Sequence, residues 1–535
     1  MQKRSVLLLV AILFAMSGIL AKLVKIGRDP IESVSLSQST VTVTVAEQRG
    51  TIYDRHLKPL TNAETQYAAS ITADPETMAT LSNRLSKEEW EIIQNGLQSG
   101  KPVTVVSDSP FPLVKGVRQF TVPIRYSDNQ VAAHLIGYLN SDGVTGACGL
   151  EAAFDDLLRE SSGSVTVSYQ TDGRGNTLTG GKTQVSNTLK RAEGGICLTI
   201  EKDVQEMVEK IAGEKISKGA VVVMEAQSGN VTALASFPSF NSNRLADYLE
   251  REDAPLFNRA LATYNCGSVF KTVSALAALE SGYSASKTYT CLGALKVGGN
   301  RIKCHHVLGH GELDMTKGFA LSCNPYFMQL IAETGASPLY RLACALGFDS
   351  PILLTDRYAT SRATIPDEQT LLQETVLANV SFGQGNLMAT PIHVAQMTAC
   401  VVNGGYYYRP NVLYGIVNEN GALTRNEKEA PISVCSAASA ETVKNMMIAV
   451  VEEGSGKSAK PRIGGAGGKT GTAETGWRGE DGEMMVQNWF TGFYPAENPR
   501  YVITVLAEDS GRTGESAAPV FADLCDGLYR LRYSA

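Results

Sequence analysis

The sequence predicts an α+β protein in three parts: an N-terminal apolar segment, a strand-rich region, and a larger region that mixes helices with strands. Three observations carry this prediction. An uncharged run covers residues 5–21, residues 35–72 alternate in strand fashion, and helical patterns alternate with short apolar strands from Lys218 onward. The 535 residues are 43% hydrophobic and 19% charged, which is typical of a folded chain.

The composition excludes two broad classes of function. The formal net charge is −6, so no basic field is present to attract nucleic acid, and no nucleic acid partner is expected. Beyond the first thirty residues, no stretch of the sequence is apolar enough to cross a bilayer, which excludes a transporter with several spans.

The apolar run is interpreted as a retained membrane anchor within residues 1–25. Its length lies at the lower end of the roughly 17 to 25 residues that a spanning helix needs. A cleaved signal peptide and a buried core helix are the alternatives, although Ile19 before Ala21 makes a poor cleavage site. Because Lys3 and Arg4 precede the run, we expect a single span, a cytoplasmic N-terminus, and an extracytoplasmic remainder.

Residues 35–215 form the predicted strand-rich region. Val41–Val45 alternates with a period of two, residues 161–195 are rich in Gly, Ser and Thr, and Glu201–Ile216 has an amphipathic helical pattern. The segment Arg49–Arg55 surrounds an apolar centre with two arginines and an aspartate. It contains no nucleophile–base pair, so we interpret it as a salt-bridged turn that holds the strands of the first domain.

Residues 218–535 form the predicted third region. It begins with the apolar strand Val221–Met224, and a turn leads to the returning strand Val231–Ala235. The last clear strand covers Tyr501–Leu506, and a final helix is expected from about Pro519 to Leu531.

A serine and a lysine stand three residues apart at the predicted start of a helix in this region. The apolar pattern after Gly267 predicts a helix that ends at Gly282, so Ser268 lies at its N-terminus and Lys271 lies on the same face. A lysine can activate a serine hydroxyl only when it is neutral, and burial, the positive end of the helix dipole and a second cation all favour that form. By itself the pattern is also that of an ordinary helix start with a solvated lysine.

Two further short motifs follow along the chain. Ser322 and Asn324 flank Cys323 in a predicted helix end or loop, where a hydroxyl and an amide could face one cleft or could cap a helix locally. Lys469, Thr470, Gly471 and Thr472 follow a Gly-rich stretch. A strand edge here would accept an extended peptide, and the lysine and threonine would hold an anionic terminus; a Gly-rich loop is the alternative.

Together the S-x-x-K, S-x-N and K-T-G motifs are those of penicillin-binding proteins and serine β-lactamases, and the sequence resembles a class B penicillin-binding protein along nearly its whole length. The resemblance also includes the N-terminal anchor and the segments Arg49–Arg55, His134–Tyr138, Gly149–Glu151, Ser381–Gly385, Thr390–Pro391 and Asn488–Gly492.

The resemblance implies a peptidoglycan D,D-transpeptidase that works through a serine acyl-enzyme. By that likeness Ser268 is the nucleophile, Lys271 its base, Ser322 a proton relay, and Asn324 a group that positions the peptide. Of the substrate-binding segment 469–472, Lys469 and Thr470 would bind the terminal carboxylate. Gly471 would allow close approach, and the N–H groups of Ser268 and Thr472 would form the oxyanion hole.

The resemblance further implies an architecture and partners. Residues 35–215 would be an elongated pedestal, and 218–535 a transpeptidase domain with an antiparallel sheet flanked by helices, as in serine β-lactamases. Stem peptides and lipid-linked glycan strands would be substrates, β-lactams would be covalent inhibitors, and no cofactor is expected. A polytopic glycan polymerase of the shape, elongation, division and sporulation group would be the partner.

Two other functions remain compatible with the motifs. A carboxypeptidase or β-lactamase would use the same residues, although such a hydrolase needs no pedestal. The other alternative is a non-catalytic protein, either a β-lactam sensor or a scaffold for a polymerase. The complete motifs argue against this alternative.

Ten cysteines show no dense disulfide framework. If a bridge forms, Cys291 and Cys304 are the expected pair. A zinc site that uses these cysteines with His305, His306 and His310 is an alternative. A bridge or a plain structural loop is preferred to it, so no metal site is assigned. Cys323 is interpreted as a residue that packs in the core.

Overall fold

The computed structural model describes residues 2–28, 40–172, 174–178, 181–478, 482, 484–508 and 516–533. The chain forms two compact units. Unit 1 comprises Met1–Arg49, Glu64–Arg125 and Ser162–Ala192, and unit 2 comprises Gly50–Ala63, Tyr126–Ser161 and Glu193–Ala535.

The boundary between the units does not coincide with the boundary predicted near residue 218, because strand pairing draws earlier segments into unit 2. Strand β2 (Thr51–Tyr53) pairs in parallel with β8 (Gly195–Leu198), and β8 pairs antiparallel with β20 (Leu413–Val417). The predicted start of the strand-rich region at residue 35 lies outside the described residues.

Unit 1 contains the N-terminal helix α1 (Gln2–Arg28), which includes the apolar run. Among the described residues, no helix meets the length and apolarity required of a membrane span. The unit also contains two three-stranded sheets, ordered β1-β6-β7 and β4-β3-β5, which confirms a strand-rich region. The strands are β1 (Thr40–Gln48), β3 (Glu64–Ile71), β4 (Val103–Ser107), β5 (Val117–Ile124), β6 (Gly163–Gln170) and β7 (Thr183–Asn187).

Two helices of unit 1, α3 (Pro75–Arg84) and α4 (Lys87–Leu97), start where the sequence provides N-terminal caps. The Asp74 carboxylate accepts two backbone N–H bonds at the start of α3, and Ser86 forms a capping box with Glu89 at the start of α4.

Unit 2 is built around a five-stranded antiparallel sheet in the order β10-β9-β25-β24-β23. This sheet, with helices on both faces, agrees with the fold expected for this region. The strands are β9 (Gly219–Glu225), β10 (Val231–Phe237), β23 (Gly467–Arg478), β24 (Met484–Tyr494) and β25 (Tyr501–Ala507).

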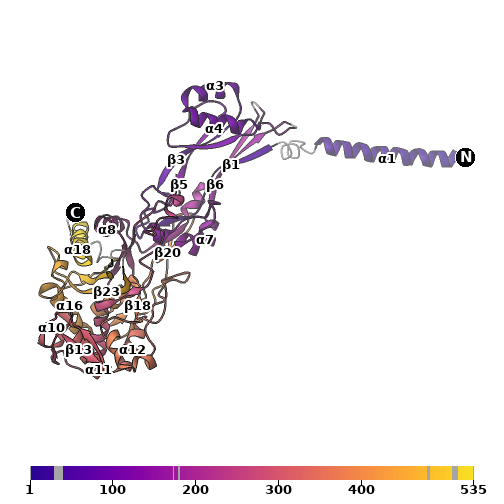
Figure 1. The fold of residues 1–535 in the computed structure, drawn as a ribbon. Helices are drawn as coiled ribbons and strands as arrows, with labels where there is room; N and C mark the ends of the chain where they lie inside the picture. Colours follow the sequence, from indigo (N-terminus) through magenta and orange to yellow (C-terminus); the bar gives the residue numbers. More distant parts are fainter. Residues whose placement is uncertain are drawn as a thin grey trace. The chain divides into compact units, whose positions relative to one another are not determined.

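Successive side chains of β9 point to opposite faces of the sheet, and each face belongs to a different hydrophobic core of this unit. Val221 and Val223 pack in one cluster with α8 (Lys202–Gly213) and α18 (Ala517–Tyr533), which lie side by side (Figure 1). Val222 and its neighbours on the opposite face pack in a second, larger cluster, whose helices are α9 (Lys271–Glu280), α15 (Pro391–Val402) and α16 (Ala437–Glu452). Helix α9 therefore lies in the larger cluster, where it packs against other helices, and α15 lies between it and the sheet's strands β9 and β25.

Shorter elements complete unit 2. The helices are α5 (Ala133–Ile136), α6 (Gly149–Ala153), α7 (Asp155–Glu160), α10 (Met315–Ala320), α11 (Asn324–Thr334), α12 (Ala336–Ala345), α13 (Glu368–Leu371) and α14 (Glu374–Val380). The strands are β11 (Tyr264–Asn265), β12 (Tyr289–Cys291), β13 (Ala294–Val297), β14 (Asn300–Lys303), β15 (Gly311–Leu313), β16 (Leu353–Thr355), β17 (Tyr358–Ala359), β18 (Met388–Ala389), β19 (Tyr406–Tyr407), β21 (Leu423–Arg425) and β22 (Ile432–Ser433).

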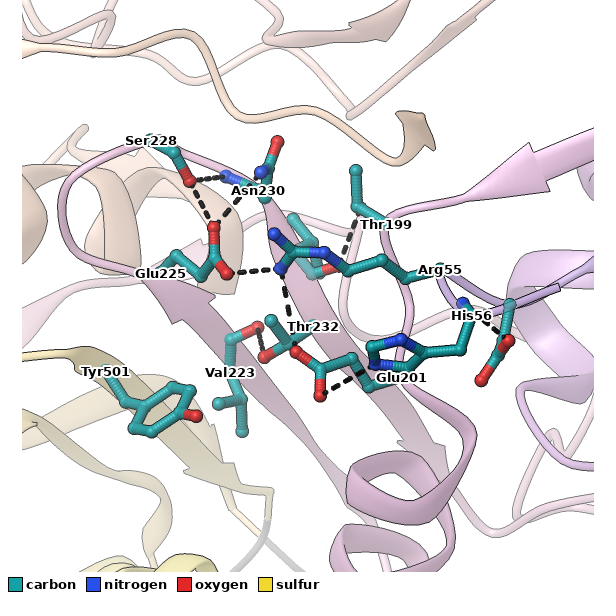
Figure 2. Close-up of polar contacts among 12 residues, drawn as sticks. Arg55, His56, Thr199, Glu201, Val223, Glu225, Ser228, Asn230, Thr232 and Tyr501 are labelled. Atoms are coloured by element: carbon teal, nitrogen blue, oxygen red, sulfur yellow. Dashed lines mark hydrogen bonds and ion pairs between the residues drawn. The ribbon is translucent and has the colours of Figure 1, made fainter. Parts of the chain in front are cut away.

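The predicted salt-bridged turn is present, but it holds elements of unit 2. Figure 2 shows the Arg55 guanidinium between two carboxylates: Glu225 at the end of β9, which it contacts directly, and Glu201 at the start of α8, at 3.6 Å. The Glu225 carboxylate also accepts hydrogen bonds from Ser228 Oγ at 2.5 Å and Asn230 Nδ2 at 3.0 Å. Strands β2 and β8 both lie within the predicted first domain, 35–215, but they belong to unit 2, and Arg55 ties them to Glu225 on β9, which lies beyond that predicted domain.

Candidate active site

Ser268 lies in a 3₁₀ turn, Gly267–Phe270, that continues directly into α9. Gly267 has φ +59°, and a Cβ at this position would lie 2.7 Å from the carbonyl oxygen of Thr472. Its N–H donates to the carbonyl of Gly383 at 2.9 Å, and a Cβ on Gly383 would meet the carbonyl oxygen of Gly267 at 1.8 Å. The turn that presents Ser268 is therefore held between β23 and the loop at 383, and only glycines fit these contacts.

Lys271 brings the first two motifs together. Its Nζ lies 2.7 Å from Ser268 Oγ, one helical turn earlier, which confirms that the two side chains share a face. The same nitrogen lies 2.7 Å from Asn324 Oδ1 and 3.1 Å from Ser322 Oγ, and it donates to the Ser322 carbonyl at 3.0 Å.

Burial of Lys271 is complete and changes its protonation. Desolvation lowers the pKa of Lys271 to about 7. The rings of Phe327 and Phe382 lie 5.9 Å and 6.0 Å from Nζ. An amine with a pKa near neutrality can accept a proton from Ser268 and return it within one reaction cycle.

Ser322 and Asn324 lie where α10 ends and α11 begins, as the sequence predicts. Ser322 has the left-handed backbone conformation, with φ +54°, and Cys323 is the N-cap of α11. This strained turn directs the Ser322 hydroxyl between two lysines, at 3.1 Å from Lys271 Nζ and 3.0 Å from Lys469 Nζ. The hydroxyl can therefore exchange hydrogen bonds with both amines.

The third motif lies on β23, the edge strand of the five-stranded sheet. Lys469 is fully buried, and burial together with the charge of Lys271 holds the pKa of its amine well below the usual range. Thr470 is half-buried and Thr472 exposed. At Gly471 a Cβ would lie 2.9 Å from Val269 Cγ1, so glycine lets the strand approach the turn that carries Ser268.

Several residues beside these motifs escaped the sequence analysis. Ser455 Oγ lies 2.9 Å from Thr470 Oγ1, although Ser455 belongs to a Gly-rich stretch with no motif of its own. Phe382 stands in the segment Ser381–Gly385 that the resemblance includes, and Phe327 follows the second motif. That both rings border Lys271 depends on contacts between distant segments, which the sequence pattern does not reveal.

The structure also corrects the expected bridge. All ten cysteines, each within the described residues, are free thiols, so Cys291 and Cys304 are not joined. Instead, ligand atoms of Cys291, Cys304, His310 and Cys323 all lie within 4.8 Å of one another. Cys323, interpreted from the sequence as packing, is the member that links this cluster to the second motif.

Comparisons with known proteins agree with the geometry. Residues 219–526 match the family described as the penicillin binding protein transpeptidase domain. Stage V sporulation protein D of Bacillus subtilis is 30% identical over 433 residues, which cover 77% of this chain and 64% of that protein, so the chain spans less than two thirds of that relative. Peptidoglycan D,D-transpeptidase MrdA of Acinetobacter baumannii is 25% identical over 545 residues, which cover 88% of this chain and 80% of that protein.

Solved structures share the fold. Penicillin-binding protein 2 of Helicobacter pylori, in complex with MreC, superposes with a TM-score of 0.68 at 20% identity, covering 92% of this chain and 99% of that one. Penicillin binding protein 3 of Mycobacterium tuberculosis, complexed with aztreonam, superposes with a TM-score of 0.65 at 23% identity. The superposition covers 92% of this chain and 97% of that one.

Because the family match covers more than half of its length, the chain belongs to the penicillin-binding proteins with a transpeptidase domain. It is a class B member, as the sequence predicts, and its enzyme class is that of serine-type D,D-transpeptidases.

Proposed function

We propose that this enzyme cross-links peptidoglycan by transferring the peptidyl group of one stem peptide to an amine of another. One observation carries the proposal: a single buried amine, Lys271 Nζ, lies within 3.1 Å of Ser268 Oγ, Ser322 Oγ and Asn324 Oδ1. In this proposal Ser268 is the nucleophile, Lys271 its base, Ser322 the relay and Asn324 the positioning amide, and their mutual contacts support these roles.

In the first step Ser268 Oγ attacks the carbonyl carbon between the two terminal D-alanines. The serine proton passes to the neutral amine of Lys271 as the C–O bond forms. Lys271 and Ser322 then deliver a proton to the departing nitrogen, and the C–N bond breaks to release D-alanine and leave an ester on Ser268.

The edge strand β23 supplies the binding surface in this proposal. An extended stem peptide adds to this edge as a further strand, with its terminal carboxylate at Thr470 and the amine of Lys469 behind it. The backbone N–H groups of Ser268 and Thr472 face the carbonyl oxygen and stabilise the negative charge that develops there. Support comes from the contact between Gly267 and Thr472, which places their backbones against each other.

In the second step the amine of a neighbouring stem peptide attacks the ester carbonyl carbon, and a new amide C–N bond forms as the C–O bond to Ser268 breaks. The proton that the amine loses passes through Lys271 to Ser268 Oγ. β-Lactams present a strained amide in place of the D-alanyl-D-alanine bond, so the same serine opens the ring and retains the product. M. tuberculosis relatives solved with ampicillin and with imipenem as an acyl-enzyme support this proposal.

We further propose a cell-membrane location with the enzyme outside the cytoplasm. Helix α1 would be the single-pass anchor, residues 35–215 the pedestal, and 218–535 the transpeptidase domain. The exposed apolar side chains of α1, such as Phe14 and Leu20, support insertion into lipid. Lipid-linked glycan strands and a polytopic glycan polymerase are the proposed partners, and the relative solved with MreC supports a place among shape-determining assemblies.

Fluorescent penicillin tests the proposed chemistry. The full chain, purified in detergent, should become labelled covalently and keep the label for many minutes. Ser268→Ala should abolish labelling, whereas Ser281→Ala, an exposed serine at the end of the same helix, should not change it. Equal labelling of the two variants would overturn the assignment of the nucleophile, and rapid turnover of penicillin would point to a hydrolase.

A further inference from the structure

Three cysteines and one histidine gather directly behind the second catalytic motif in unit 2. We call Cys291, Cys304, His310 and Cys323 the thiol–imidazole cluster. The three cysteines are at most 3% exposed, and His310 is partly exposed. Three segments supply them: the end of β12 supplies Cys291, the loop between β14 and β15 supplies Cys304 and His310, and the N-cap of α11 supplies Cys323.

The four ligand atoms lie close enough together for one metal ion to bind all of them. All of them lie within 4.8 Å of one another, and Cys304 Sγ lies 3.5 Å from His310 Nδ1. With Zn–S near 2.3 Å and Zn–N near 2.0 Å, tetrahedral angles put neighbouring ligand atoms about 3.5–3.8 Å apart. Small side-chain movements would bring the remaining pairs into that range.

The backbone around the cluster is held in place independently of the four side chains. The N–H of Cys304 donates to the carbonyl of Gly293 at 2.9 Å. A Cβ on Gly309 would meet the Cys291 carbonyl oxygen at 2.2 Å, so the 304–310 loop packs against the end of β12 only because glycine stands there.

The neighbouring histidines are less suited to the same centre. His306 Nδ1 lies 2.9 Å from the Gly309 carbonyl, which accepts its hydrogen bond, and His305 Nδ1 lies 3.9 Å from Cys304 Sγ, farther than His310 Nδ1. His310 is therefore the imidazole that completes the set.

We propose that the thiol–imidazole cluster binds one Zn²⁺ as a closed structural site. Three thiolates and one imidazole are the soft and borderline donors that zinc prefers, and four protein ligands leave no open position for a reacting water. The metal ties the β12–β15 segment to the start of α11 and compensates for burying three thiolates side by side.

The site has a direct consequence for the catalytic motif. Cys323 stands between Ser322 and Asn324, both of which lie within 3.1 Å of Lys271 Nζ. A metal bond on Cys323 fixes the strained Ser322 turn from behind, so Cys323 is a positioning residue that touches neither substrate nor nucleophile.

Metal analysis of the full chain, purified in detergent under reducing conditions, tests the site. We expect about one equivalent of zinc per chain, lost in Cys304→Ser and in His310→Ala. Cys525→Ser, a buried cysteine in α18, and His306→Ala, in the same loop as His310, should retain it. Loading the wild-type chain with Co²⁺ should give the thiolate charge-transfer bands and intense visible bands of tetrahedral cobalt, a readout that does not depend on whether a variant folds.

Three results would overturn the proposal: less than about a tenth of an equivalent of zinc in the wild-type chain, full retention of zinc by Cys304→Ser, or a Cys291–Cys304 disulfide in the purified protein.

Ser268→Ala separates this proposal from the proposed function, because it should keep zinc while losing the penicillin label. Chelation should slow acylation by about 10- to 100-fold, and added Zn²⁺ should restore it. A purely peripheral metal would leave that rate unchanged.

Discussion

Lys271 Nζ lies 2.7 Å from the hydroxyl oxygen of Ser268 inside a site where the lysine has no exposed surface. Its amine is held by three oxygen atoms, two from Ser322 on the loop after α10 and one from Asn324 at the start of α11. The serine is thus paired with a base whose protonation is set by burial, and this pairing determines how the enzyme should respond to pH.

The acylation rate should rise with pH through neutrality. Burial lowers the pKa of Lys271 to about 7, and only the neutral amine can accept the serine proton. The reactive fraction is therefore small at pH 5.5, about half near pH 7, and nearly complete by pH 8.5. Stopped-flow measurement of acylation by a fluorescent β-lactam should give this sigmoidal rise, and a flat profile from pH 6 to 8.5 would contradict it.

Lys271→Arg should remove most acylation without removing the positive charge. A guanidinium stays protonated at every accessible pH, so it cannot act as the base. We expect the acylation rate constant to fall by about 10²- to 10⁴-fold. Lys317→Arg, in helix α10, is the matched control and should acylate at the wild-type rate. Acylation retained by Lys271→Arg would show that Lys271 acts through its charge and not as a base, and equal losses in the two variants would show that the effect is not specific to position 271.

Gly267→Ala should destabilise the site more than Gly282→Ala does. Both glycines have positive φ, but only at Gly267 would the new Cβ strike backbone, at 2.7 Å from the Thr472 carbonyl oxygen, whereas nothing lies within 4 Å at Gly282. Gly282→Ala should cost about 1 kcal/mol of unfolding free energy from left-handed strain alone. Denaturant titration should show a larger loss for Gly267→Ala together with slower acylation; equal losses would contradict the steric argument.

Arg55→Met should lower the stability of unit 2 but leave the nucleophile intact. It removes the cation that Glu225 and Glu201 share; Glu201, which is only 8% exposed at its side chain, keeps its ion pair with Arg532, so the Glu225 carboxylate bears most of the loss. The expected loss is about 1–3 kcal/mol, by comparison with about 3–5 kcal/mol for a fully buried pair. Lys58→Met breaks an exposed pair with Asp203 and should cost less than about 1 kcal/mol. Thermal unfolding should show the larger loss of stability in Arg55→Met than in Lys58→Met. Both variants should still be labelled by fluorescent penicillin.

Thr470→Val should weaken acylation by carboxylate-bearing β-lactams about tenfold, because it removes one charge-assisted hydrogen bond. The loss should be in the binding constant rather than in the acylation rate constant, since Thr470 contacts neither Ser268 nor Lys271 directly in any hydrogen bond that the structure gives. Thr442→Val, a partly exposed threonine on α16, controls for the substitution. A β-lactam lacking the carboxylate should bind both variants equally.

The sequence alone determined those features that depend on neighbours along the chain. Ser268 and Lys271 are three residues apart, and helical geometry places such residues on one face, so their pairing follows from local structure. The strands Val221–Met224 and Val231–Ala235 were likewise predictable, because their apolar pattern and the turn between them are local.

Only the tertiary structure decided which distant groups meet. Lys271 contacts Ser322 across 51 residues of sequence and Ser322 contacts Lys469 across 147, and neither distance has a periodicity that a sequence pattern could reveal. The burial that lowers the pKa of Lys271 comes from packing of α9 within the core of unit 2. The same packing left Cys291 and Cys304 unbridged and placed Cys323 beside them, because thiols far apart in sequence are brought together by the loops around them and not by their spacing.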